Sequence, residues 1–448
     1  MRTLRRFAVL VATGALAGTL GAGCSGATVS PATSANPTSG APTTAASQPA
    51  APVTVTFWTH THPPMIEVYK KLVADYHTQN PNVTIDYQTI PNNEFGTKML
   101  TSLSGGTGPD VINMDDSALR GDYFPKGLLA PIDPAALGAA SVDEVVARYV
   151  PGTLAGAMDA QGTLYGLPSE FNGTAMAINA AHFKDAGLDA TTTPLATWDD
   201  VYAAGQKLAA AGHKQAFSFL YLHSGWYSQQ LQTLLHQTGG SIAKDGKGTL
   251  DSPESLKALQ LWVDLAGGAR SVADPNKTSR EATVPFQDLA TGVQSMAILY
   301  PWSMDQIKST NPDTYKNLSV VTLPQFDPAN PSSRVYAYYW AVNKASKVQP
   351  EAWKFVNFLS QHSDDFLTGT SFVQPLVGWD SKPAAKEIPF IETWGKAYAT
   401  GKFDEVTEHY SEVQDVLTKM VNDAVFDKKP VADAAREASA EVTRILGN

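Results

Sequence analysis

The sequence predicts an α/β protein of two lobes, each a doubly wound, mainly parallel sheet flanked by helices. The chain has 448 residues, which is too long for one compact core, because single cores stop growing at about 250–300 residues. Between residues 53 and 114, strand-like apolar alternation takes turns with the three- and four-residue apolar spacing of helices. Strands that alternate with helices form parallel sheets, and ligands bind in the loops after the carboxyl ends of such strands.

The N-terminus has the features of an export signal. Arg2, Arg5 and Arg6 precede an apolar run over 7–20 that is too short for a permanent membrane span. We therefore expect residues 1–23 to be a signal peptide. The paired arginines are only a weak twin-arginine signal.

Cys24 is the only cysteine of the chain, so no disulfide can form within it. It follows Gly-Ala-Gly, and this arrangement resembles the lipobox of bacterial lipoproteins, in which the cysteine is lipidated and becomes the first residue. Gly21 departs from that pattern, which prefers a branched residue there. A plain secreted protein cut nearby is the alternative. Residues 25–52 are almost entirely Ala, Ser, Thr, Pro and Gly, so we expect 24–52 to be a lipidated cysteine with a disordered tether.

The first lobe begins with three strands and two helices. Strands are predicted over 53–58, 83–90 and 110–114, and helices over 65–76 and 95–103. Pro81 prevents the first helix from continuing. The loops at 58–62, 91–94 and 115–117 therefore follow strand ends, where side chains can reach a ligand.

The chain crosses between the lobes in the stretch LYGLPSEFNGTAMAIN, residues 164–179. A Gly-Leu-Pro turn precedes polar residues and then the alternation of a strand over 174–178. Because proline cannot donate a ladder hydrogen bond, we expect Pro168 outside any central strand. Glu170 and Asn172 have no apolar partner in the pattern and suit the floor of a cleft. An exposed loop is the alternative.

The second lobe repeats the alternation of strands and helices. Helices are expected over 198–211, 226–236, 253–266, 404–426 and 431–446, and further strands over 216–221, 295–300, 318–323 and 335–343. Thr197 and Ser252 are the expected N-caps of two of these helices. The strand over 335–343, VYAYYWAVN, is the expected return crossing.

Several stretches, taken in this order, resemble the family-1 extracellular solute-binding proteins of bacterial ABC importers, the carbohydrate-binding branch that includes maltose-binding proteins. They are VTFW, FGTKMLTSLSGGTGPDVINMDD, YGLPSEFNGTAMAIN, TWDDVYAAGQKLA, GVQSMAILYPW, AYYWAVNKASK and EAWKFVNFLS. The resemblance covers the chain from Val53 onward and departs from the family in loop lengths. It implies a type II periplasmic-binding-protein-like fold with three hinge crossings. The lobes would comprise 53–166 with 327–370, and 167–326 with 371–448.

The resemblance also implies a function. The protein would be an extracytoplasmic lipoprotein, anchored to the outer face of the cell membrane through Cys24. It would act as a monomer that captures a sugar between its lobes and delivers it to the permease subunits of an ABC transporter. Neither catalysis nor a cofactor is implied.

The candidate ligand site combines aromatic rings with acids and amides, which suit the apolar face and the hydroxyl rim of a sugar. The expected contacts are Trp58, His60, Asn93, Asp115, Asp116, Glu170, Asn172, Trp226, Tyr227, Trp302, Tyr338 and Trp340. Tyr338, Tyr339 and Trp340 are contiguous on one strand, so only some of them can face a ligand. Capping of a turn or helix is the alternative role for Asp115 and Asp116.

Composition and motifs limit the other function classes. The net charge is −10 without a basic cluster, so nucleic acid is not an expected partner. His60 and His62 lack a third metal ligand nearby, so we expect no zinc site. The candidate loops hold almost no Arg or Lys, which favours a neutral mono- or oligosaccharide over a glycerol phosphodiester or another anionic solute. The remaining alternative is a secreted glycoside hydrolase, which needs two carboxylates about 5–9.5 Å apart.

Overall fold

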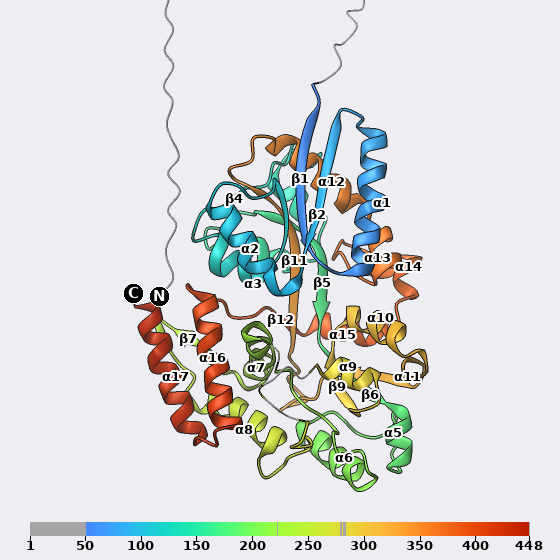
Figure 1. The fold of residues 1–448 in the computed structure, drawn as a ribbon, viewed down its shortest axis with the longest axis vertical. Coiled ribbons are helices and arrows are strands. Elements are labelled where there is room, and N and C mark those ends of the chain that lie inside the picture. Colours follow the sequence, from blue (N-terminus) through green and yellow to red (C-terminus); the bar gives the residue numbers. More distant parts are fainter. Residues whose placement is uncertain (1–50, 222, 278–279, 281–283, 448) are drawn as a thin grey trace, which may run out of the picture. The chain divides into compact units, whose positions relative to one another are not determined.

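The computed structural model describes residues 51–221, 223–277, 280 and 284–447 (Figure 1). The predicted signal peptide, Cys24 and nearly all of the predicted tether lie outside these residues.

The first sheet joins the start of the chain to a strand near residue 340. Within the described residues it has the order β12-β11-β3-β1-β2, and β4 and β5 also pair with β11. Its strands are β1 (Val53–His60), β2 (Val83–Ile90), β3 (Val111–Asp115), β4 (Leu129–Ala130), β5 (Gly166–Gly173), β11 (Ser333–Asn343) and β12 (Gly401–Lys402). As predicted, β1 is parallel to β2 and β3. The long β11 runs antiparallel to β3, β4 and β5, and Figure 1 shows it beside β5.

Helices cover the first sheet because their apolar positions recur on one side. They are α1 (Pro63–Gln79), α2 (Asn92–Ser104), α3 (Asp116–Ala118), a π-helical turn (Leu119–Tyr123), α4 (Val142–Val146), a 3₁₀ turn (Ala155–Ala157), α12 (Gln349–Gln361) and α13 (Ser363–Thr370). Phe57 of β1 meets Tyr69 of α1 and Phe355 of α12, with ring centroids 5.0 and 5.6 Å apart. Both helices therefore pack on the same side of β1.

Pro168 lies in strand β5, which is an edge strand because β11 is its only ladder partner in the described structure, so Pro168 stays outside the central strands as predicted. Tyr338 of β11 pairs with Glu170, but the next residue, Tyr339, pairs with Pro168. Ser169 is therefore left over in a β-bulge. A bulge interrupts the ladder locally, and this allows a strand to include a proline.

The second sheet has the order β10-β6-β9 in the described part of the chain, and both pairings are antiparallel. Its strands are β6 (Ala175–Asn179), β9 (Met296–Leu299) and β10 (Leu318–Thr322), and β7 (Ala243–Lys244) pairs with β8 (Lys247–Gly248) in a small hairpin. The expected strand over 216–221 forms isolated bridges at Phe217 and Tyr221 instead of a ladder, and Phe217 pairs in parallel with Met296. The amide groups of Ala216 and Phe217 both donate to the carbonyl of Val272 instead of forming a ladder.

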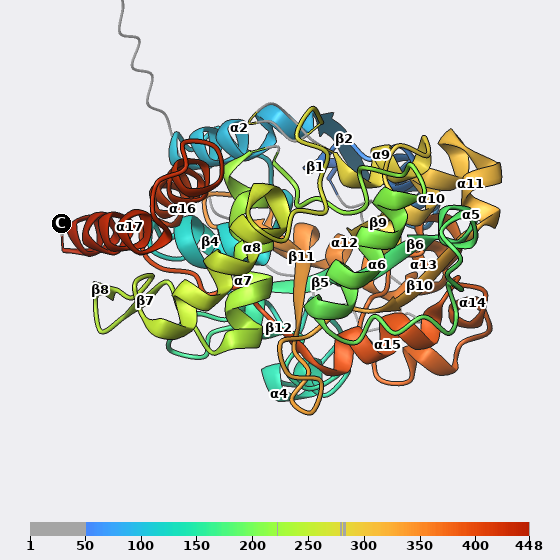
Figure 2. The ribbon, with the colours of Figure 1, turned by 90° about the horizontal axis from the view of Figure 1, so that it is seen from below.

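Helices form most of the second region, by which we mean residues 175–322 and 371–447. They are α5 (Ala180–Asp185), α6 (Trp198–Ala210), α7 (Ser224–Thr238), α8 (Pro253–Gly267), α9 (Pro285–Ala290), α10 (Pro301–Thr310), α11 (Pro312–Lys316), a 3₁₀ turn (Trp379–Ser381), α14 (Pro383–Lys386), α15 (Ile391–Ala399), α16 (Tyr410–Val425) and α17 (Val431–Leu446). Thr197 and Asp200 form a capping box at α6, and Ser252 caps α8, as predicted. The last two helices lie side by side in Figures 1 and 2.

Helix α16 begins at Tyr410, later than the predicted start at residue 404. The preceding segment uses its polar groups elsewhere. Asp404 accepts hydrogen bonds from Arg334, and the carboxylate of Glu405 accepts from the amides of Ile242 and Ala243. Side chains committed to distant partners hold this segment in a non-helical path.

Candidate functional site

The candidate site is built where β11 pairs with β5. Tyr336 and Tyr338 are two residues apart on β11 and therefore project from the same face. Their partners on β5 are Asn172 and Glu170, and Asp115 of β3 also pairs with Tyr338. Because directly paired residues project to the same side of a sheet, these five side chains share one face.

Two of these side chains are buried without a hydrogen-bond partner. Glu170 is 3% exposed and its Oε2 has no partner, and Asn172 is 1% exposed with neither amide atom paired to any described residue. Buried polar groups are nearly always hydrogen-bonded, and an unpaired one costs about 1–3 kcal/mol. Such groups are typical of places where a bound molecule completes the hydrogen bonding.

Other residues of the first sheet and its neighbouring loops also have buried polar atoms without a partner in the described structure. Both ring nitrogens of His62, Nδ1 of His60, Nε1 of Trp58 and both amide atoms of Gln374 are buried without a partner in the described structure. The ring of His60 lies 4.8 Å from that of Tyr338, and the ring of His62 lies 5.2 Å from that of Phe372.

Gln374 reaches this neighbourhood because the residue before it bridges to β5. Val373 forms an isolated antiparallel bridge with Phe171, whose amide donates to the Val373 carbonyl at 2.7 Å. The sequence analysis missed Gln374 entirely and considered His62 only as a metal ligand. Neither residue stands in a recognisable motif, and only the path of the folded chain brings them here.

Burial keeps Glu170, His60 and His62 uncharged at neutral pH. It raises the pKa of Glu170 to about 8 and lowers the pKa of His62 to about 4. Burial also lowers the pKa of His60 to about 3, with a smaller contribution from the charge of His62. At pH 7 these three side chains therefore offer neutral donors and acceptors.

Asp115 caps helix α3, which is the alternative role that the sequence analysis gave for it. Its Oδ1 accepts the amides of Ser117 and Ala118 at 3.1 and 3.0 Å. Burial and then the nearby charge of Asp116 raise the pKa of Asp115 to about 6, against the opposing amide of Ala118. One carboxylate oxygen of Asp115 is thus bonded to the amides of α3, and Asp115 remains the strand partner of Tyr338.

A row of aromatic rings connects the two sheets through the candidate site. In order they are Trp226, Phe286, Trp302, Tyr300, Tyr336, Tyr338, His60 and Phe95, with successive centroids 6.4, 5.4, 5.7, 5.5, 6.3, 4.8 and 5.7 Å apart. Trp302 packs against the cores around both sheets, and its Nε1 donates to the hydroxyl of Tyr336 at 2.7 Å. Tyr336, which the sequence analysis did not single out, is the ring at which the two sheets meet.

Four residues named from the sequence do not join this cluster. Asn93 is exposed in the first turn of α2, and Asp116 is fully buried in an ion pair with Arg120 at 2.6 Å. Tyr227 is a core residue whose hydroxyl donates to Asn422. Trp340 is likewise buried, and its Nε1 donates to the hydroxyl of Tyr69. In each buried case a protein partner already takes the polar atom that a ligand would need.

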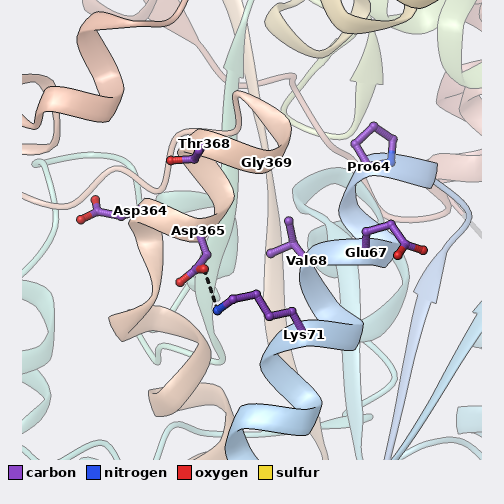
Figure 3. A pocket seen from close by; sticks show the side chains of 8 residues that line it. All are labelled: Pro64, Glu67, Val68, Lys71, Asp364, Asp365, Thr368 and Gly369. Carbon is purple, nitrogen blue, oxygen red and sulfur yellow. Dashed lines mark ion pairs between the residues drawn. The ribbon is translucent and has the colours of Figure 1, made fainter.

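A separate hollow of about 510 Å³ lies between α1 and α13 (Figure 3). It is lined by Pro64, Glu67, Val68, Lys71, Asp364, Asp365, Thr368 and Gly369. Lys71 crosses it to Asp365 at 3.0 Å, and Asp364 is held by Lys382 at 2.8 Å. The hollow contains none of the residues predicted to bind ligand.

The described residues have neither a cluster of metal ligands nor a helix suited to crossing a membrane. They contain no group of three or more His, Cys, Asp or Glu side chains placed to hold a metal ion. In the same part of the chain, no helix combines the length and the apolar character needed to cross a membrane.

A model of the bacterial extracellular solute-binding proteins matches residues 62–364. The chain belongs to this family. The predicted family and fold class are thus confirmed, although the second sheet is antiparallel where a mainly parallel one was expected. Members of this family bind solutes outside the cell.

Individual members share a low percentage of identical residues with this chain, but the similarity extends over most of its length in two of the three cases below. A binding protein of Brucella abortus is 24% identical over 413 residues, which cover 88% of this chain and 92% of that one. The arabinooligosaccharide-binding protein of Bacillus subtilis is 23% identical over 279 residues, or 60% of each chain. The solute-binding protein of an ABC transporter from Thermotoga lettingae, solved with α-D-tagatose, has a TM-score of 0.74 at 22% identity and covers 88% of this chain and 99% of that one.

Proposed function

We propose that this protein captures a neutral mono- or oligosaccharide at the face formed by Glu170, Asn172, Tyr336 and Tyr338, and delivers it to the permease of an ABC transporter. The observation that carries the proposal is a set of buried, uncharged polar groups without protein partners beside a row of rings. A sugar has hydroxyl groups that both donate and accept, and an apolar ring face that packs on aromatic surfaces. The arabinooligosaccharide-binding relative and the tagatose-bound neighbour support this ligand class.

The charges around the site favour a neutral ligand over a glycerol phosphodiester. The guanidinium groups of Arg120 and Arg334 are paired with Asp116 and Asp404. Lys98 has its ammonium group over the ring of Trp58, 5.3 Å from the centroid. A phosphate group calls for arginine or lysine side chains that converge on it, and the paired carboxylates here oppose one.

The two sheets belong to two lobes that close on the ligand. The chain passes between them at Thr174, where β5 of the first sheet ends and β6 of the second begins, and again between Thr322 and Ser333. The chain passes from the first lobe back to the second after α13, and this is the third passage. Ligand contacts made by both lobes in the closed state favour closure, and Trp302 and Tyr336 are placed to make them.

The protein acts as a monomer at the outer face of the cell membrane and performs no catalysis. The Gly-Ala-Gly sequence before Cys24 and the Ala-, Ser-, Thr- and Pro-rich segment after it support lipidation of Cys24 and an anchored, tethered protein. A binding protein kept beside its permease needs this arrangement.

A thermal-shift screen followed by calorimetry tests the proposal, since a ligand that binds the native state raises the melting temperature. The panel contains arabinotriose, maltose, maltotriose and tagatose as neutral sugars, with glycerophosphocholine and a chromogenic glycoside as the alternatives. We expect Glu170→Ala and Trp302→Ala each to weaken binding of the best neutral sugar at least tenfold, or about 1.4 kcal/mol.

Glu392→Ala removes an exposed carboxylate from α15 and serves as the matched control, with affinity unchanged. Wild-type affinity in both site variants would remove the site assignment. A shift with glycerophosphocholine alone would replace the sugar by a glycerol phosphodiester, and turnover of the glycoside would make the protein an enzyme.

A further inference from the structure

Arg334 has one guanidinium nitrogen without a partner. The residue is 1% exposed, and its Nε and Nη2 donate to the two carboxylate oxygens of Asp404 at 2.8 Å each. The third nitrogen, Nη1, is buried and has no partner in hydrogen-bond geometry among the described residues, although the hydroxyl of Tyr300 lies near the guanidinium. An unmade hydrogen bond of a buried charged group is costly, so an acceptor for Nη1 is to be expected.

The position of Arg334 places this nitrogen at the candidate site. Arg334 precedes Tyr336 by two residues on β11 and therefore shares a face with Tyr336 and Tyr338. Its Cζ lies 5.0 Å from the centroid of the Tyr336 ring. The ring of Tyr300 is 5.5 Å from that of Tyr336, so the guanidinium lies beside the rings that join the two sheets.

The charge of this guanidinium is cancelled locally. Asp404 forms a bidentate pair with it, and Arg120 joins the same cluster by donating from Nη2 to Asp116 at 2.6 Å and to the carbonyl of Asp404 at 3.0 Å. Two arginines thus face two carboxylates. The N–H groups on Nη1 of Arg334 can therefore donate to a ligand, while the two carboxylates compensate the positive charge of the two arginines.

We propose that Nη1 of Arg334 donates a hydrogen bond to a neutral oxygen of the bound sugar, and that Asp404 sets the preference for a neutral over an anionic ligand by compensating the guanidinium. The inference rests on the proposed function. It makes Arg334 a ligand contact and Asp404 a positioning residue that acts through it. Neither residue was among the candidates from the sequence.

Two variants separate these roles. Arg334→Lys keeps a positive charge for Asp404 but loses the fork that presents a third N–H. Asp404→Asn keeps the shape of the acceptor and leaves the guanidinium uncompensated. Arg270→Lys changes a half-buried arginine that is paired with Asp199 at 2.6 Å and is the matched control.

The neutral probes are maltotriose and arabinotriose, and the anionic probes are glucuronate and digalacturonate. We expect folded Arg334→Lys to bind the better neutral probe at least tenfold more weakly than wild type. We expect Asp404→Asn to raise the ratio of anionic to neutral affinity at least tenfold.

Monodeoxy analogues of the neutral probe identify the contact. Removal of one hydroxyl group should weaken binding to wild type at least fivefold and binding to Arg334→Lys by less than twofold, which is a coupling that a purely structural role would not produce. If the folded Arg334→Lys protein binds the neutral probe within twofold of wild type, the inference is overturned and the proposed function stands.

If wild type binds no sugar at all, the proposed function fails and takes the inference with it. Asp404→Asn leaves a charge buried without its partner and can unfold the protein. In that case the affinities of Arg334→Lys and its analogue series decide alone.

Discussion

Glu170 illustrates how burial alone can set the charge of a carboxyl group. Its pKa rises from 4.5 to about 8 because the side chain is buried. Between these values the folded protein keeps a proton that the unfolded chain has released. The free energy of unfolding must therefore fall as the pH rises through this window, by up to a few kcal/mol.

The variant Glu170→Gln should remove this fall, because an amide does not titrate. We expect its stability between pH 4.5 and pH 8 to be flatter than that of wild type, whose carboxyl titrates across that range. Urea unfolding at several pH values measures this. An identical slope in both proteins would show that Glu170 ionises as freely in the fold as in the unfolded chain.

His62 should affect the free energy of unfolding at acidic pH. Burial lowers its pKa from 6.5 to about 4, so the unfolded chain binds a proton more readily than the native state. Stability is therefore lost as the pH falls from 6.5 towards 4. The variant His62→Gln should lose less stability than wild type over this interval in acid unfolding, whereas His77→Gln, at an exposed position of α1, should follow wild type.

Sequence reasoning named several residues that the fold brings together, but it could not name the hydrogen-bond partners of others. Glu170, Asn172, Trp302 and Tyr338 lie near one another, and their role in binding stays a prediction. Tyr227 and Trp340 were also named, but nothing in a run of residues shows that Asn422 and Tyr69 accept their polar hydrogens. Such pairings depend on positions far apart in the chain.

At the level of single elements, one close helix contact gives a test. Gly369 of α13 faces α1 beside the hollow of Figure 3, and a Cβ there would lie 2.5 Å from Cγ2 of Val68. Gly395 of α15 has nothing within 4 Å of the corresponding position. Replacing glycine by alanine inside a helix stabilises by roughly 0.5–1 kcal/mol where there is room.

We expect Gly395→Ala to raise the free energy of unfolding by about that amount, and Gly369→Ala to lower it by about 1–3 kcal/mol because the helices must move apart. Denaturant titration of the two variants compares them directly. A stabilised Gly369→Ala would mean that α1 and α13 can separate at no cost.

Local signals identified most elements of the fold. Capping residues and apolar spacing gave α6, α8 and α17 close to their observed bounds. Signals failed where tertiary contacts override local preference. The segment 403–409 contains the predicted helix start at residue 404, but Asp404 and Glu405 bond to distant partners and α16 begins only at Tyr410.

At the scale of the whole molecule, the hydrogen bond from Trp302 to Tyr336 joins groups from the two proposed lobes. Such a bond contributes about 0.5–1.5 kcal/mol. In Trp302→Phe the ligand-free protein should have a larger radius of gyration than wild type by X-ray scattering in solution, because closure loses this support. A saturating sugar should reduce the difference.

The matched control is Trp262→Phe. It removes an indole hydrogen bond of the same kind, 2.7 Å long, to the hydroxyl of Tyr221 within the core of the second region. Its radius of gyration without ligand should equal that of wild type. Equal radii for all three proteins would show that Trp302 does not connect moving parts.

The pairing of β11 also bears on how the protein is made. Strands β3, β4 and β5 all pair with residues 333–343, so a nascent chain that stops short of residue 343 cannot complete its amino-terminal sheet. Contacts of such sequence separation form late, because a long loop must close first. A polypeptide threaded through a translocase with its amino end leading would thus remain unfolded for most of its passage, which is the condition that passage requires.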